Sequence, residues 1–255
     1  MTFSKNYVSS PRDKARFPSL RFYRDLMLIM YHAGRIAKKG AYDGDRWVYD
    51  SVLVGQAMEK LGTKIIIEGV EHLDFEGPCI FESNHMSTLE TMLLPSIIQP
   101  RKDVTFVVKK SLLNYPCLGP VLEARDPIAL GRVNPREDLM LVMKKGAELL
   151  AQGRSVIIFT QGTRKPVVDT RDFNSLAVKL AKKASVPVVP VALKTDAWSE
   201  GSLMKDFGWI RPEIPVHVCF GPRISIGGTG KEEHEEILKF ISGKFMAWQK
   251  EDGKK

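Results

Sequence analysis

The period of hydrophobic and polar positions changes near residue 63. Before that point, residues 19–39 and 46–62 carry apolar side chains at helical spacing, with basic residues interleaved in the first stretch. Gly62 ends the second stretch, and the turn-like residues 40–45 separate the two. Two helices are therefore predicted before any strand. In the first, we expect an apolar side formed by Leu20, Tyr23, Met27, Met30, Tyr31, Gly34 and Ala37.

After residue 63, short apolar runs alternate with longer amphipathic stretches. The runs predict strands at 64–70, 78–84, 104–110, 127–132, 155–160, 186–193 and 214–221. The stretches predict helices near 86–98, 110–122, 136–152, 172–184 and 232–250. This alternation indicates an α/β fold, with a mixed, largely covered sheet flanked by helices. We expect residues 1–62 to form a basic arm with a two-helix motif, residues 63–255 to form the α/β domain, and functional residues to lie in loops at strand ends.

Composition narrows the class of protein. With 44% hydrophobic and 27% charged residues, the chain has enough apolar material for an ordered core. Its three cysteines form no CxxC pair, which argues against a disulfide framework and a structural zinc site and is compatible with a reducing cytoplasm. We expect no metal, and no secretory signal, because the basic N-terminus has no apolar h-region and no small-residue cleavage site. No membrane-spanning helix is expected either, because no apolar run approaches ~18 residues.

Positive charge is concentrated at the start of the chain. The net charge is +8, and residues 1–40 hold nine Lys or Arg against two Asp. Such a block suits an anionic surface, either membrane or nucleic acid, although a solvated arm is the simpler alternative. Met, Tyr and Trp beside basic residues are typical of an interfacial anchor. A helical hairpin packed on the core would have a similar sequence.

His85 follows Asn84 where a predicted strand turns into a helix, and Glu90 lies five residues later. A carboxylate that accepts from one ring nitrogen leaves the other free to take a proton, which is the arrangement of a general base. However, residues 87–90, Ser-Thr-Leu-Glu, also match a capping box, in which Ser87 caps the helix and Glu90 reaches back to its amide. The stretch alone leaves both readings open.

A second polar loop follows the strand at 155–160. Gly162 permits backbone amides to converge, Thr163 adds a hydroxyl, and Arg164 offers a planar fork that matches phosphate or carboxylate oxygens. The segment is therefore a candidate anion site, although Gly-Thr-Arg also makes ordinary turns. Lys109, Lys110 and Arg132 end two other strands, and these cations either share a pocket with Arg164 or form a solvated rim.

Taken in order, four segments resemble the motif blocks of the glycerolipid acyltransferase family, which includes 1-acylglycerol-3-phosphate acyltransferases. They are NHMSTLE, KKSLLNYPCLG leading to PIALGR, FTQGTR, and VPVVPV. The resemblance covers about residues 64–225. The two predicted N-terminal helices are also similar to the membrane-interface helices of bacterial members.

The resemblance implies roles for particular residues. His85 would be the general base and Glu90 its orienting carboxylate, while Arg132 and Arg164 would bind the acceptor phosphate, with Lys109 or Lys110 nearby. Gly162 and Thr163 would shape the phosphate-binding loop. Supporting positions would be Asn84, Ser87 and Gln161, and the block around Pro187 and Pro190 is associated with the acyl donor. This chain departs from the family pattern at two positions: Glu90 stands where Asp is usual, and Gln161 where Glu is usual.

The resemblance implies an O-acyltransferase of phospholipid biosynthesis. It would use acyl-CoA or acyl carrier protein as donor substrate, and a lysophospholipid, foremost 1-acylglycerol-3-phosphate, as acceptor. No cofactor and no nucleic acid are expected, and the enzyme would be peripheral on the cytoplasmic face of an anionic membrane. The alternatives are another acceptor, such as an amino-acid lipid or glycerol 3-phosphate, and a catalytically inactive lipid-binding protein.

Overall fold

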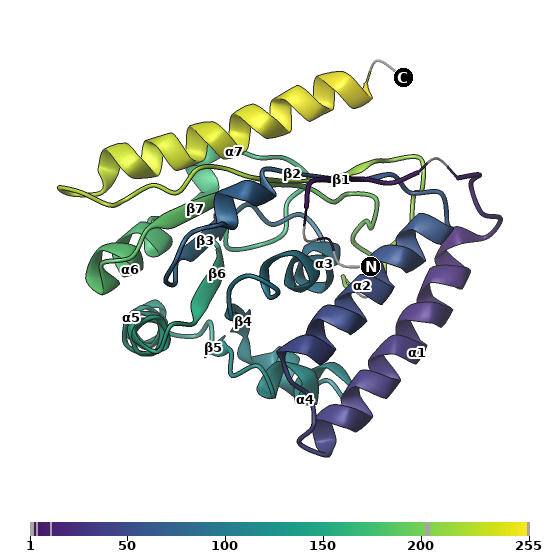
Figure 1. Cartoon of the computed structure of the whole chain (residues 1–255), viewed down its shortest axis with the longest axis horizontal. Helices are drawn as coiled ribbons and strands as arrows, with labels where there is room; N and C mark the ends of the chain where they lie inside the picture. Colours follow the sequence, from purple (N-terminus) through teal and green to yellow (C-terminus); the bar gives the residue numbers. More distant parts are fainter. Residues whose placement is uncertain (1–2, 4, 11, 202–204, 254–255) are drawn as a thin grey trace.

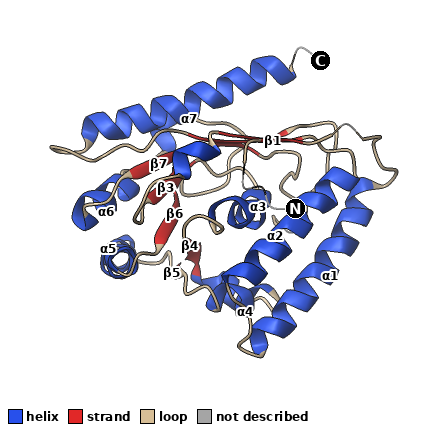
Figure 2. Ribbon diagram, viewed as in Figure 1, coloured by secondary structure: helices blue, strands red, loops and turns tan. Residues whose placement is uncertain are grey.

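The computed structural model describes residues 3, 5–10, 12–201 and 205–253. Positions 1–2, at the start of the predicted N-terminal arm, and 254–255, at the end of the predicted α/β domain, lie outside the described residues. The predicted α/β architecture is confirmed: helices cover both faces of one mixed sheet (Figure 2).

The eight strands have the order β1-β2-β8-β7-β3-β6-β4-β5. From β7 to β5 all neighbours are parallel, β2 is parallel to β8, and the pairs β7–β8 and β1–β2 are antiparallel. Five strands therefore bring their carboxyl ends to one edge of the sheet. The strands are β1 (Tyr7–Val8), β2 (Ile65–Glu68), β3 (Ile80–Ser83), β4 (Val104–Lys109), β5 (Ile128–Leu130), β6 (Ser155–Phe159), β7 (Val188–Lys194) and β8 (Val216–Phe220).

Six of these strands fall within the predicted runs, β7 extends one residue beyond its run, to Lys194, and β1 is the exception. It has only two residues, too few to show a period, and it pairs with β2 at the edge of the sheet. The helices are α1 (Pro18–Lys38), α2 (Gly44–Lys60), α3 (Leu89–Ile98), α4 (Leu118–Glu123), α5 (Pro135–Ala151), α6 (Leu176–Ala184) and α7 (Lys231–Asp252). The predicted helices at 110–122 and 172–184 each begin with a 3-10 turn, at Lys110–Asn114 and Thr170–Asp172.

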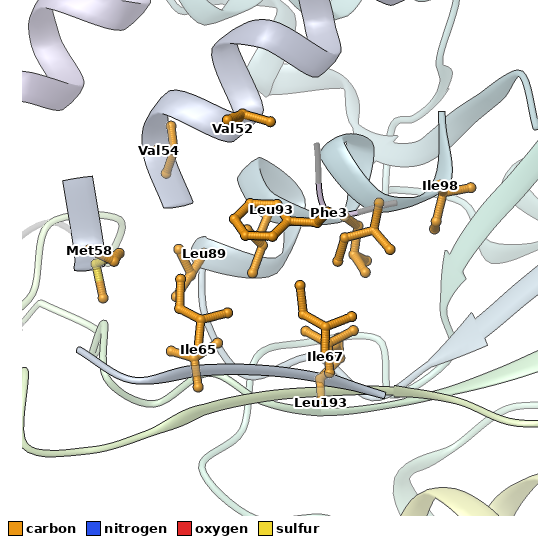
Figure 3. Packing of buried hydrophobic residues seen from close by; sticks show 14 of the residues in the cluster. Phe3, Val52, Val54, Met58, Ile65, Ile67, Leu89, Leu93, Ile98 and Leu193 are labelled. Carbon is orange, nitrogen blue, oxygen red and sulfur yellow. The ribbon is translucent and has the colours of Figure 1, made fainter. Parts of the chain in front are cut away.

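Two apolar clusters lie on opposite faces of the sheet. On one face α1, α2, α3 and α4 pack together, and on the other lie α5, α6 and α7 (Figure 1). Figure 3 shows part of the first cluster, where Val54 and Met58 of α2 approach Leu89 and Leu93 of α3 above the sheet residue Ile65. The two N-terminal helices thus share one core with the sheet.

Helix α1 differs from its prediction. Its buried apolar side chains include Phe22 and Leu26, whereas Leu20, Met27 and Tyr31 of the expected apolar side are 73%, 55% and 51% exposed. The difference arises because apolar residues occur around most of this helix, and contact with α2 and α4 buries only one side. An apolar and basic side of α1 is left facing outward.

Candidate active site

His85 lies in the loop that leaves β3 at the carboxyl edge of the sheet. The preceding Asn84 is fully buried, and its side chain donates to the carbonyl of Leu193 and accepts from the Leu193 amide, both at 2.9 Å. Ser83 Oγ also donates to the Val191 carbonyl at 2.8 Å. These bonds tie the end of β3 to β7, so the loop that carries His85 starts from a fixed point.

The imidazole of His85 and the carboxylate of Glu90 form a close pair. Nδ1 of His85 lies 2.8 Å from Oε1 of Glu90, whose side chain is fully buried. The carboxylate also accepts from the Met86 and Ser87 amides, from Ser87 Oγ, and from Thr195 Oγ1 at 2.5 Å. Burial opposes ionisation of Glu90, but the bond and charge interaction with His85, together with the bonds from Thr195 and Ser87, outweigh it and hold the pKa of Glu90 below its ordinary value.

The same geometry accounts for the capping box. Helix α3 begins at Leu89 with Thr88 at the N-cap, one residue later than predicted. Ser87 Oγ still accepts from the Leu89 amide at 3.1 Å, which is the bond expected of a capping serine. The Glu90 carboxylate accepts from the Ser87 amide, as a capping box requires. One carboxylate thus both caps the helix and contacts His85, so the two readings of the sequence are compatible.

Strand β6 and the loop after it also contact His85. Its ring stacks on Phe159 with centroids 4.3 Å apart, and its amide donates to Gln161 Oε1 at 3.1 Å. Gln161 Nε2 in turn donates to the Val167 carbonyl at 2.9 Å. An ionised glutamate could not make this second bond, because a carboxylate only accepts. Gln161 therefore ties its own loop to the His85 loop as an uncharged link.

Arg164 is the cation of this loop that lies closest to the start of α3. Gly162 has a φ of 76°, and the amides of Gly162 and Thr163 donate to the carbonyls of Phe159 and Gln161 within the turn. The guanidinium of Arg164 donates to Thr88 Oγ1 at 2.7 Å and contacts an aspartate, Asp206, at 2.6 Å. Arg164 thus points toward the start of α3, close to the His85 loop.

The remaining predicted cations lie at the same edge of the sheet but farther along it. Lys109 ends β4, Lys110 follows it and Arg132 comes after β5; all three are exposed and lie beyond β6 in strand order. Arg132 has a φ of 57°, and its amide donates to Asp138 Oδ2 at 2.8 Å. Of the described cations that the sequence indicated, Arg164 alone lines the cavity beside His85. The predicted role of Lys109, Lys110 and Arg132 in phosphate binding stays a prediction.

The two prolines of the fourth block support β7. Pro190 lies within the strand, and its carbonyl accepts from the Gly221 amide at 2.8 Å. Pro187 lies at the amino end of the same strand, where its carbonyl accepts from the Ile80 amide at 3.0 Å. Pro187 is therefore at the edge of the sheet opposite His85.

A largely apolar cavity of about 360 Å³ adjoins the pair. Its walls come from α1, α2, α3, α4 and the loops around them, and His85, Thr88, Arg164 and Asp206 are among the few polar side chains in it. A volume of this size is in the range of small-molecule sites. The described residues contain no cluster of three or more His, Cys, Asp or Glu suited to a metal ion.

Sequence reasoning missed Thr195, Phe159 and Asp206. Thr195 and Phe159 lie at the carboxyl ends of β7 and β6, so the rule that such ends converge could have indicated both. Asp206 has no comparable signal, because it lies in an irregular segment far from the motifs in sequence.

Comparison with known proteins agrees with this architecture. The family model described as Acyltransferase matches residues 64–194. A 1-acyl-sn-glycerol-3-phosphate acyltransferase of Pseudomonas aeruginosa is 32% identical over 69% of this chain and 65% of its own length. A chloroplastic relative of the same name from Brassica napus, BAT2, is 34% identical over 51% of this chain and 37% of its own. The chain thus spans less than two thirds of the length of these relatives.

A solved structure has the same fold. The 1-acyl-sn-glycerophosphate (LPA) acyltransferase PlsC from Thermotoga maritima superposes with a TM-score of 0.69 at 19% identity, over 91% of this chain and 95% of the other. Because the family model covers half of the chain, with the His85 and Arg164 loops inside the match, the chain belongs to the acyltransferase family.

Proposed function

We propose that this protein transfers a fatty acyl group from a thioester donor, acyl-CoA or acyl carrier protein, to the free hydroxyl of a lysophospholipid, foremost 1-acylglycerol-3-phosphate. The observation that carries the proposal is the His85–Glu90 pair at the wall of an apolar cavity. The relatives named 1-acyl-sn-glycerol-3-phosphate acyltransferase support this choice of acceptor.

In the proposed reaction His85 acts as general base. With Nδ1 protonated and donating to Glu90, Nε2 presents a lone pair that takes the proton of the acceptor hydroxyl as its oxygen attacks the thioester carbonyl. The tetrahedral intermediate then expels the thiolate, which takes the proton from the imidazolium. Glu90 stabilises the imidazolium between the two steps, and no acyl-enzyme forms. General-base assistance of this kind supplies about 10²- to 10⁴-fold.

Phosphate recognition is assigned to Arg164 in this proposal. It lines the same cavity as His85, and a guanidinium fork matches two oxygens of a phosphate. Arg164→Ala should weaken binding of phosphate-bearing acceptors by about 10-fold or more, with little change for acceptors that lack phosphate. An acceptor profile identical to that of the wild type would count against this role.

The apolar and basic outer side of α1 supports docking on an anionic membrane. Aromatic and apolar side chains enter the interface, while cations meet anionic lipid. No helix among the described residues has the length and hydropathy needed to span a bilayer. Since Phe22 and Leu26 belong to the core, deletion of residues 1–40 would unfold the protein. The double variant Leu20→Ser/Tyr31→Ser is the better test, because these exposed side chains do not line the cavity, and it should reduce vesicle binding. Unchanged binding would place the anchor elsewhere.

The central experiment is a screen of labelled acyl donors against a panel of lysolipids with the purified protein, read by mass spectrometry. Transfer to 1-acylglycerol-3-phosphate above other acceptors is the expected result. Transfer only to an amino-acid lipid or to glycerol 3-phosphate would keep the reaction and change the acceptor. Lipid binding without transfer to any acceptor would replace the enzyme with a binding protein.

A further inference from the structure

The arginine assigned to phosphate binding already holds a carboxylate. Arg164 Nη2 lies 2.6 Å from Asp206 Oδ1, and its Nε lies 3.4 Å from Glu200 Oε1. Asp206 also accepts from Tyr115 at 3.2 Å and from Thr88 at 3.4 Å. A phosphate that binds Arg164 through two nitrogens uses Nη2 in either fork of the guanidinium, so it competes with Asp206 for that nitrogen.

The residues that follow Asp206 are unusual for a soluble surface. Phe207 and Trp209 are 43% and 76% exposed. Between them, the position of Gly208 is fixed by close packing, since a Cβ there would lie 1.9 Å from the Ser199 carbonyl oxygen. A fixed turn thus presents two aromatic side chains beside the carboxylate that holds Arg164.

This segment is attached to α1. The Tyr23 ring lies 5.5 Å from that of Phe207, and Tyr23 Oη donates to the Gly208 carbonyl at 2.5 Å. The Ile210 amide donates to Ser19 Oγ at 3.0 Å. The exposed aromatic residues therefore continue the apolar and basic side of α1, where Arg21, Arg24 and Arg35 are also exposed, as is Arg16 just before the helix.

The charges and apolar groups of this combined surface fit an anionic lipid surface. Exposed arginines attract acidic headgroups, and Trp and Phe rings prefer the headgroup level of a bilayer. A lysolipid phosphate lies at that same level. Contact with the surface would then place a competing anion, with up to two negative charges, next to the Arg164–Asp206 pair.

We propose that Asp206 is an internal counter-ion that occupies Arg164 until the phosphate of a membrane-borne acceptor replaces it, and that Phe207 and Trp209 bring the pair to the lipid surface. The inference rests on the proposed function, because it takes Arg164 as the phosphate ligand. It adds that the phosphate site is closed by the chain's own carboxylate away from lipid. The carboxylate leaves Arg164 as the phosphate arrives, so the guanidinium has an anionic partner throughout the exchange.

Direct binding tests the counter-ion without requiring turnover. Calorimetry measures the affinity of a water-soluble, short-chain lysophosphatidate for the wild type and for Asp206→Asn. Because Asp206 lowers the fraction of protein whose Arg164 is open, the variant should bind about tenfold more tightly. The matched control is Asp172→Asn, which removes the partner 2.6 Å from Lys165 in the neighbouring pair and should leave the affinity unchanged. Equal or weaker binding by Asp206→Asn would overturn the proposal.

Presentation in a vesicle tests the lipid contact. With lysophosphatidate in phosphatidylcholine vesicles, the KM of Asp206→Asn should be lower than that of the wild type by less than about threefold. The reason is that the lipid surface already promotes the replacement of Asp206 by phosphate in the wild type. Trp209→Ser should raise KM in vesicles but leave the affinity for the soluble analogue unchanged. An equal advantage of Asp206→Asn in both presentations, or no effect of Trp209→Ser, would overturn the role of the lipid surface.

Failure of the proposed function would look different. If Arg164→Ala binds the soluble lysophosphatidate as well as the wild type, Arg164 is not the phosphate ligand, whatever Asp206 does. If the wild type binds the analogue but transfers no acyl group, the reaction is wrong, while the calorimetric comparison of Asp206 variants still stands.

Discussion

Two fully buried glutamates only eight positions apart have opposite environments. Glu90 accepts from two backbone amides, two hydroxyls and the His85 ring, and its pKa lies below the ordinary value. Glu82, in β3, accepts from Thr160 Oγ1 at 2.9 Å, and its Oε2 has no hydrogen-bond partner among the described residues. Burial raises the pKa of Glu82 to about 8. At neutral pH Glu90 is therefore a carboxylate and Glu82 mainly a carboxylic acid.

Each glutamate also has a histidine neighbour. His85 Nδ1 lies 2.8 Å from Glu90, on the cavity side of the sheet, whereas His234 Nδ1 on α7 lies 3.6 Å from Glu82, on the opposite face. Burial lowers the pKa of His234, so this pair is mostly uncharged. A histidine beside a buried acid is thus not enough for general-base chemistry. The acid must be kept ionised by donors, and the imidazole must reach a substrate cavity.

Substitution of each histidine by alanine should give the largest difference in acyl transfer between the two pairs. His85→Ala should lower acyl transfer by about 10²- to 10⁴-fold, because the acceptor hydroxyl loses its base. His234→Ala, the matched control, should keep transfer within about threefold, because its ring lies behind the sheet. Rates measured with purified variants of unchanged circular dichroism provide the check. Wild-type transfer by His85→Ala would refute the base assignment.

Substitution of Glu90 should have the next largest effect. Glu90→Gln should reduce transfer by about 10²-fold or more, because an amide cannot stabilise the imidazolium as a carboxylate does. It should also lower the free energy of unfolding by about 1–3 kcal/mol. The reason is that the NH₂ group of glutamine replaces a carboxylate oxygen that accepts from backbone amides and hydroxyls, and these donors lose their acceptor. Glu90→Asp should keep part of the activity, because it retains the charge. Kinetics and thermal denaturation of the same samples distinguish a catalytic role of Glu90 from a capping role. Lower stability with normal turnover would leave Glu90 as a helix cap only.

The strands and the His85–Glu90 pair could be predicted because their signals are local. The apolar run at 78–84 and the Ser-Thr-Leu-Glu segment lie within a dozen residues of His85, and the structure places them together. The two N-terminal helices were predicted for the same reason. The outward direction of Leu20 and Met27 was not, because apolar periodicity cannot tell which of two apolar sides meets the core.

Long-range contacts explain what the sequence did not reveal. Thr195 reaches Glu90 across 105 positions, and Asp206 reaches Arg164 across 42. These partners meet only because β3, β6 and β7 are adjacent and parallel. The difference between Glu82 and Glu90 has the same origin, since identical side chains acquire different charge states from the donors that the fold supplies.

The pH dependence of the free energy of unfolding should reveal the protonation of Glu82. Substitution of Glu82 should have little effect on acyl transfer. Its folded pKa of about 8 is above the ordinary value of 4.5, so the folded protein binds an extra proton between these limits. The contribution of Glu82 to the free energy of unfolding is therefore fully present below about pH 4.5 and is lost as pH rises through 8. Glu82→Gln is neutral at every pH, so it should remove this decline. The difference in the free energy of unfolding between the variant and the wild type should therefore be larger at pH 8 than at pH 5, by on the order of a few kcal/mol in favour of the variant. Urea unfolding at both pH values measures the difference, with the exposed Glu213→Gln as control. If Glu82→Gln and the wild type decline in parallel, Glu82 is ionised in the folded protein, and the contrast with Glu90 fails.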